Sequence, residues 1–110
     1  MTPLARTFAA LSDPTRLDLV EKLLTRGELP AGTLAADFDI SAPAISRHLK
    51  VLREAGLIDQ RVAGTKRYYT ARPDAIRAIN QWTMDHRAFW ASSLDRLDSL
   101  LALDPEGDQT

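Results

Sequence analysis

Cations and hydroxyl groups gather on one side of a short segment in the middle of the chain. From Ser41 to Ile58 the sequence is S-A-P-A-I-S-R-H-L-K-V-L-R-E-A-G-L-I. At about 100° per residue, Ser46, Arg47 and Lys50 fall on the face opposite to the apolar side chains. A guanidinium fork matches the edge of a guanine, while an ammonium or hydroxyl group can hold a phosphate. These residue types therefore favour contact with an anionic partner that also presents hydrogen-bonding edges.

The same segment carries the signals of a capped amphipathic helix. Ser41 is placed to accept from the first free backbone N–H groups, and Pro43 fits the first turn, where no donor is missed. Gly56 can adopt the left-handed conformation that ends a helix. The expected apolar stripe consists of Ile45, Leu49 and Leu52. The segment thus predicts a helix that buries one face and exposes the other.

The charge of the chain is unevenly distributed. The formal net charge of the 110 residues is −1, but residues 41–72 hold seven basic and two acidic residues, a net charge of +5 against −6 elsewhere. A basic face on an acidic body suits an anionic partner that approaches from one side.

Shorter helical patterns precede this segment. Apolar residues recur at helical spacing over residues 4–11, which predicts a first helix. Asp13 is the expected N-cap of a second helix, and Pro14 is its expected first residue. The apolar stripe expected on this second helix is Leu17, Val20, Leu23 and Leu24. Residues 31–38 predict a third helix. Its short connection to the helix over residues 41–55 is typical of a helix-turn-helix.

Alternating apolar residues after the mid-chain helix predict a two-stranded hairpin over residues 57–70. Gly64 supplies a permissive turn residue. Arg61, Lys66 and Arg67 cluster around the tip, where backbone can follow a phosphate chain.

A long helical pattern with both tryptophans runs from Pro73 to about Leu103. A helix of about 30 residues is about 45 Å long, which is longer than a domain of this size can cover. Part of the apolar stripe of this helix, with part of the first helix, should therefore pack against a second copy of the chain. The expected interface residues are Leu4, Phe8, Leu11, Trp82, Phe89, Trp90, Leu94, Leu97 and Leu101. The expected fold class is mainly α with a two-stranded β wing, a winged helix-turn-helix of four helices, a hairpin and one final helix. We expect a single domain over residues 1–103 and a disordered tail over residues 104–110.

Several function classes are disfavoured. No cysteine is present, which excludes thiolate ligands, and Asp85 and His86 are neighbours that point about 100° apart on a helix, so we expect no metal and no cofactor. Asp95 and Ser92 share that helix, without the oxyanion loop of a hydrolase, so we expect no enzyme. No apolar run approaches the roughly 20 residues that span a bilayer, and no signal segment is evident. We therefore expect a cytoplasmic protein without a membrane partner.

Three segments together resemble the ArsR-type (ArsR/SmtB) winged helix-turn-helix repressors. Residues 8–16 resemble the entry signature of that family, residues 46–58 its recognition helix and residues 64–69 its wing. The resemblance implies a homodimer, joined by its first and last helices, that places one recognition helix in each of two successive major grooves of a palindromic operator. Many relatives carry paired cysteines where this chain has P-A-G-T-L over residues 30–34, so the closer resemblance is to the metal-independent members. It identifies no small-molecule or protein effector.

The expected contacts with double-stranded DNA lie on the recognition helix and the wing. Arg47 is expected at a base edge, with Ser46 beside it, while Lys50, Arg53 and Ser41 are expected to hold phosphates. The full set is Ser41, Pro43, Ala44, Ser46, Arg47, His48, Lys50, Arg53, Arg61, Lys66, Arg67 and Tyr69.

Some of these roles have alternatives. Pro43 and Ala44 could touch a thymine methyl or simply permit close approach. His48, at the border of the core stripe, favours a structural or phosphate-facing role over that of a sensor. Tyr68 and Tyr69 alternate along a strand, so one should pack inward while the other can reach a phosphate. The aromatic residues of the last helix favour packing over a ligand pocket.

The leading hypothesis is a dimeric, sequence-specific transcriptional regulator, most simply a repressor that blocks transcription by occupying its operator. The alternative is a winged-helix module for protein association that does not bind DNA. The concentration of basic residues in the helix and hairpin favours the first.

Overall fold

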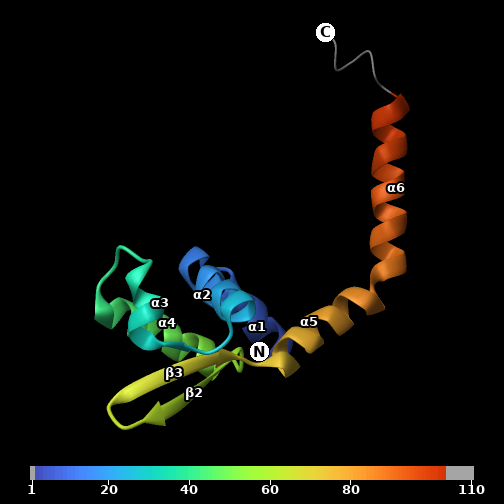
Figure 1. Cartoon of the computed structure of the whole chain (residues 1–110). Helices are drawn as coiled ribbons and strands as arrows, with labels where there is room; N and C mark the ends of the chain where they lie inside the picture. The colour runs from blue at the N-terminus through green and yellow to red at the C-terminus, as the bar shows by residue number, and fades with distance from the viewer. Residues whose placement is uncertain (1, 104–110) are drawn as a thin grey trace. The chain divides into compact units, whose positions relative to one another are not determined.

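The computed structural model describes residues 2–103, and contacts divide the chain into two units. The first unit extends to Ala78 and the second begins at Ile79, within α5. Figure 1 shows the order of the elements, which are α1 (Pro3–Leu11), α2 (Pro14–Arg26), β1 (Leu29–Pro30), α3 (Ala31–Ala36), α4 (Ala42–Glu54), β2 (Ile58–Ala63), β3 (Lys66–Ala71), α5 (Pro73–Asp85) and α6 (Arg87–Leu103). Together they confirm the expected fold class.

Helices α2 and α4 begin at side-chain caps. Asp13 Oδ2 accepts from the backbone N–H of Arg16 at 3.0 Å, and Ser41 Oγ accepts from that of Ala44 at 3.2 Å. Pro14 is the first residue of α2. Each cap satisfies a donor that the helix itself leaves unpaired. The predicted starts of both helices are confirmed.

The end of α4 is a Schellman motif. Gly56 adopts a φ of +76°, its N–H donates to the Arg53 carbonyl, and the N–H of Leu57 donates to the Leu52 carbonyl, both at 3.0 Å. Leu57 and the adjoining Ile58 are buried. The cap therefore turns the chain from the helix directly into β2.

The sheet has three antiparallel strands in the order β1-β3-β2. Ala63 pairs with Lys66 across the predicted turn, in which Gly64 has a φ of +63°. The wing is thus the expected hairpin, but the sequence did not reveal β1, whose Leu29 pairs with Tyr69. Pro30 ends this edge strand, where the donor that proline lacks is not needed.

The core of the first unit lies where α2, α3 and α4 meet the sheet. The predicted stripe of α4 is buried, as are Leu34, Leu57 and Ile58. On α2 the prediction was partly wrong, because Leu19 is buried with Val20 and Leu23 while Leu17 and Leu24 are exposed. The inward face of α2 is therefore rotated from the expected one.

The expected single long helix is two helices, α5 and α6, which is a correction to the predicted element order. The break lies at His86, whose N–H donates to the Thr83 carbonyl at 3.3 Å instead of continuing the α-helical pattern. His86 Nδ1 lies 2.8 Å from the Trp82 carbonyl oxygen, and the Trp90 N–H donates to the His86 carbonyl at 3.0 Å. A side chain thus takes the carbonyl that the His86 N–H would have used.

The single domain expected over residues 1–103 stays a prediction, and the tail expected over residues 104–110 lies outside the described residues. Between residues 2 and 103, no helix is long and apolar enough to cross a bilayer.

Candidate nucleic-acid interface

Helix α4 presents a polar face that no other part of the described chain covers. Pro43, Ser46, Arg47, Lys50 and Arg53 are all exposed. The three cations among them form no ion pair with any residue from 2 to 103. Unpaired cations on one helix face remain available for an anionic partner.

Ser41, which precedes α4, and Ala44, in its first turn, have local roles. The Ser41 side chain is exposed and caps the helix, as described above. Ala44 is half-buried, so its methyl group partly faces the core. The small residues 42, 44 and 46 leave the start of α4 without bulky side chains.

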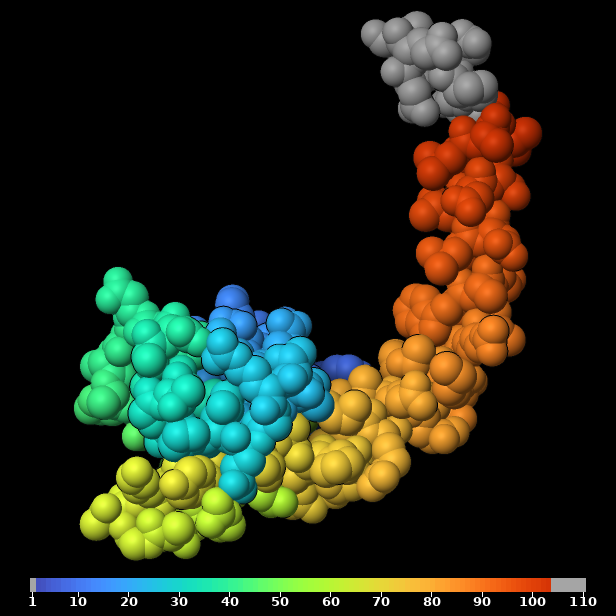
Figure 2. All heavy atoms as spheres, viewed as in Figure 1, coloured from blue at the N-terminus to red at the C-terminus, as the bar shows by residue number. Residues whose placement is uncertain are grey.

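The wing adds Lys66 and Arg67 beside its turn. Both are exposed, and neither forms an ion pair within the chain's described part. In the space-filling view, the yellow atoms of the wing lie against the cyan atoms of the segment around residue 30 (Figure 2), as the pairing of β1 with β3 requires.

The remaining two arginines of residues 41–72, the basic block of the chain, are paired. Arg61 holds Glu28, with Nη2–Oε1 at 2.7 Å and Nε–Oε2 at 3.2 Å. Arg72 holds Asp74, with Nη2–Oδ2 at 2.9 Å. These hydrogen bonds lower the pKa of both carboxyl groups and raise the pKa of both arginines. Within residues 2–103, five of the seven basic residues therefore form no ion pair.

A polar hollow of about 570 Å³ lies between α4 and the wing. Ser46, Lys50 and Arg53 reach it from the helix, and Arg67 reaches it from β3. Residues about 20 positions apart thus face the same space. The hollow brings Lys50 and Arg53 of α4 close to Arg67 of the wing, with the carboxylates of Glu54 and Asp59 also in its lining. One binding face for nucleic acid over the two elements stays a prediction.

Gln60 also lines this hollow and was not singled out from the sequence. Its Oε1 is buried and has no hydrogen-bond partner among residues 2–103. An unpaired buried acceptor costs free energy, so this atom is a weak point of the wing. No local sequence signal distinguishes Gln60 from an ordinary surface residue.

His48 points toward the start of α2. Its Nδ1 lies 3.3 Å from Nη1 of Arg16 and 3.9 Å from Oδ2 of Asp13. Arg16 also donates from Nε to the Ala10 carbonyl at 2.7 Å. The pKa of Asp13 is lowered, chiefly because its carboxylate accepts from the Arg16 N–H. His48 therefore joins α4 to the α1–α2 junction, the structural alternative foreseen for it.

The two tyrosines divide as the alternation predicts. Tyr69 is only 4% exposed and belongs to the core. Tyr68 is half-buried, and the guanidinium carbon of Arg61 lies 4.5 Å from the centroid of its ring. A strand with period two sends the Tyr69 ring inward. Tyr69 also lines the hollow between α4 and the wing, so its expected contact with DNA stays a prediction.

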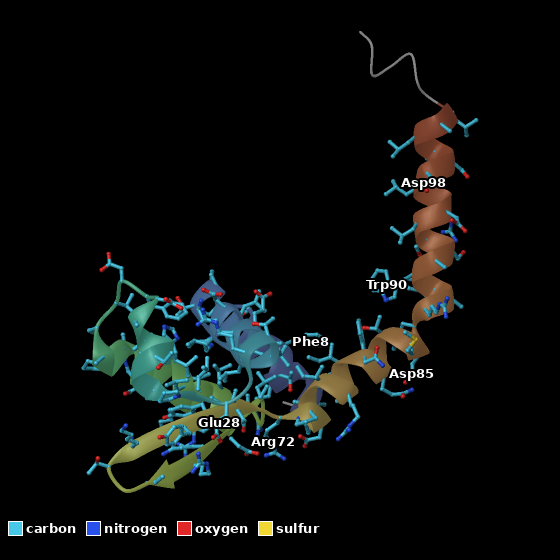
Figure 3. The ribbon with its side chains drawn as sticks, in the orientation of Figure 1. Phe8, Glu28, Arg72, Asp85, Trp90 and Asp98 are labelled. Carbon is cyan, nitrogen blue, oxygen red and sulfur yellow. The ribbon has the colours of Figure 1, made fainter. Side chains whose placement is uncertain are left out.

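The predicted interface residues separate into two groups. Leu4 and Trp82 are half-buried, Leu11 packs against the core, and Phe8, labelled in Figure 3, is 40% exposed. No residue of α5 or α6 is buried. On α6 the predicted residues are Phe89, Trp90, Leu94, Leu97 and Leu101, each between 45% and 61% exposed.

Residues 2–103 contain no group of three or more His, Cys, Asp or Glu side chains arranged to hold a metal ion. Asp85 and His86, the pair considered above, stand at the junction of α5 and α6, where the imidazole is engaged with the Trp82 carbonyl.

Comparison with known proteins assigns the class. Residues 11–61 match the family model of a helix-turn-helix domain. The HTH-type transcriptional regulator Rv2034 of Mycobacterium tuberculosis is 42% identical over 105 residues, which cover 96% of this chain and 92% of that protein. The transcriptional repressor SdpR of Bacillus subtilis is 36% identical over 71% of this chain and 86% of its own length.

Solved structures agree with the sequence relatives. The crystal structure of an ArsR family transcriptional regulator aligns with a TM-score of 0.76 and 28% identity, over 82% of this chain and 98% of that one. This chain belongs to the ArsR family of helix-turn-helix transcriptional repressors, and it is a DNA-binding regulator.

Proposed function

We propose that the protein is a homodimeric repressor that occupies a palindromic operator. Each copy places α4 in a major groove and the wing on the flanking backbone. The observation that carries this proposal is a group of five exposed cations on α4 and the wing that form no ion pair with residues 2–103: Arg47, Lys50, Arg53, Lys66 and Arg67.

The five cations have two kinds of role. Arg47 is exposed on α4 and its guanidinium fork matches a guanine edge, so we assign it to a base edge, with Ser46 beside it. The other four cations hold phosphates and set the register on the duplex. Pro43 and Ala44, at the small-residue start of α4, allow close approach to the groove.

The dimer proposal rests on α6. Trp90, Leu94, Leu97 and Leu101 are spaced by four, three and four residues, which places them along one face of the helix. Figure 3 shows Trp90 projecting from α6. A row of half-exposed large apolar side chains is typical of a surface that a second chain covers.

The signal that releases the operator is not a thiolate-bound metal, because the 110 residues contain no cysteine. We therefore propose a metal-independent member of the family without a catalytic role. Because its target is chromosomal DNA, we place it in the cytoplasm.

The test is salt-titrated binding of the purified protein to a duplex that it has selected from a random pool. We expect the selected duplex to bind at least about 10³-fold more tightly than random duplex at physiological salt. Equal affinity for both duplexes would refute the regulator proposal and favour the association module.

The dimer is tested by sedimentation at micromolar concentration. We expect one species of twice the chain mass, and Leu94→Asp should convert it to a monomer while the fold of the first unit is retained. A monomeric wild-type protein would contradict the two-half-site model.

A further inference from the structure

An ion pair reaches across the whole sheet at the middle of the wing. Glu28 directly precedes β1 and Arg61 lies on β2, while β3 runs between these two strands. The Arg61 side chain therefore crosses β3 to meet Glu28, which is labelled in Figure 3, with two hydrogen bonds of 2.7 and 3.2 Å. A planar bidentate pair of this kind fixes orientation as well as distance.

The side chain beneath the crossing is aromatic. Tyr68 on β3 is the direct cross-strand partner of Arg61, and Pro30 of β1 is the partner of Tyr68 on the other side. The Arg61 guanidinium carbon lies 4.5 Å from the Tyr68 ring centroid, within the range of a cation–π contact. Arg61 is thus held on one flat side by a ring and along one edge by a carboxylate.

The strand that follows Glu28, β1, forms few backbone pairs of its own. β1 is two residues long, it ends in Pro30, and α3 begins at the next residue. The pair between Glu28 and Arg61 therefore ties the free edge strand of the wing, β2, to the segment that leads into the first helix of the helix-turn-helix. A rotation of the wing about β3 would break both hydrogen bonds.

We propose that Arg61 is a positioning residue rather than a DNA contact, and that Glu28 is its necessary partner. Together they hold the wing so that Lys66 and Arg67 meet the DNA backbone in register with the cations of α4. The inference rests on the proposed function, and it revises the expectation that Arg61 itself binds DNA.

The two possible roles of Arg61 predict opposite signs for one substitution. If Arg61 contacted a phosphate, Glu28→Gln would free it and remove a nearby negative charge, and affinity for DNA would rise. If the pair positions the wing, Glu28→Gln lowers affinity by about two- to fivefold, the range typical of an exposed ion pair. Arg61→Gln should have an effect of the same size, and the double variant should bind no more weakly than either single one.

A matched control and a second readout complete the test. Glu54 on α4 is an exposed glutamate that lines the hollow toward the wing and forms no ion pair within residues 2–103. Glu54→Gln therefore removes a negative charge from the proposed binding face without breaking a pair, and it should not lower affinity. The slope of log affinity against log salt should be unchanged by Arg61→Gln but should fall by about 0.9 for each phosphate contact that Lys66→Gln removes.

The experiment uses the full chain and a fluorescent duplex selected by the wild-type protein, with thermal melting to verify folding. Failure of the wild-type protein to select any duplex would refute the proposed function. With a selected duplex in hand, a Glu28→Gln variant that binds equally or more tightly, or an Arg61→Gln variant with a reduced salt slope, would overturn the positioning role.

Discussion

Replacing Lys50 with glutamine should remove one phosphate contact from each copy of the repressor. Lys50 is exposed on α4, faces the hollow toward the wing and has no ion-pair partner in the described chain. Glutamine keeps most of the length of the side chain and its helix propensity, so the change isolates the charge.

The expected magnitude follows from the number of unpaired cations. Lys50, Arg53, Lys66 and Arg67 give about four phosphate contacts per chain and about eight per dimer, so log affinity should change with log salt with a slope of about −7. Lys50→Gln removes about two contacts and reduces the slope to about −5. Between 50 and 200 mM salt, affinity should then fall by about 10³-fold instead of about 10⁴-fold.

The assay is fluorescence anisotropy of a labelled operator duplex at several salt concentrations. Arg72→Gln is the matched control, because Arg72 belongs to the same basic block but is held by Asp74 and lies 3.8 Å from Asp59. It should leave the slope unchanged. A slope that Lys50→Gln does not alter, or that Arg72→Gln reduces equally, would refute the division into free and paired cations.

Three further predictions concern stability. Ser41→Ala removes the cap of α4 and should lower the free energy of unfolding by about 1 kcal/mol in urea, and an unchanged midpoint would contradict the capping role. Gln60→Met replaces the orphaned Oε1 by an apolar group of similar shape and should be neutral or stabilise the fold by up to about 1 kcal/mol in the same assay; a clear loss would mean that Oε1 has a partner. Because the pKa values of Asp13, Glu28 and Asp74 lie below their ordinary values, these carboxylates stabilise the fold above about pH 4 and lose that contribution as the pH falls further. Asp13→Asn should therefore flatten the acid side of the stability curve, and an unchanged acid limb would contradict its role.

The features that could be predicted from sequence are those specified by neighbouring residues. Asp13, Ser41 and Gly56 act within one turn of the helix ends that they cap, so local patterns were sufficient to locate α2 and α4. Gly64 likewise determined the turn of the wing. The break at His86 escaped prediction because neither proline nor glycine marks it, and it depends on a side chain that bonds the Trp82 carbonyl.

The features that could not be predicted depend on contacts between distant residues. The two residues of β1 carry no strand signal of their own and pair with Tyr68 and Tyr69 far along the chain. The basic block was visible as net charge, but the pairing of Arg61 with Glu28, 33 positions away, was not. A count of cations therefore overestimated the free ones, and only their partners separate contact from support.

Base discrimination by Arg47 tests the central claim most directly. The ratio of affinities for the selected operator and for random duplex should be measured for the wild-type protein, for Arg47→Ala and for Lys66→Ala at one salt concentration. We expect Arg47→Ala to lose about 1–3 kcal/mol of discrimination, while Lys66→Ala weakens both duplexes nearly equally and preserves the ratio. An Arg47→Ala protein that keeps the wild-type ratio would contradict the assignment of α4 as the helix that recognises the operator sequence.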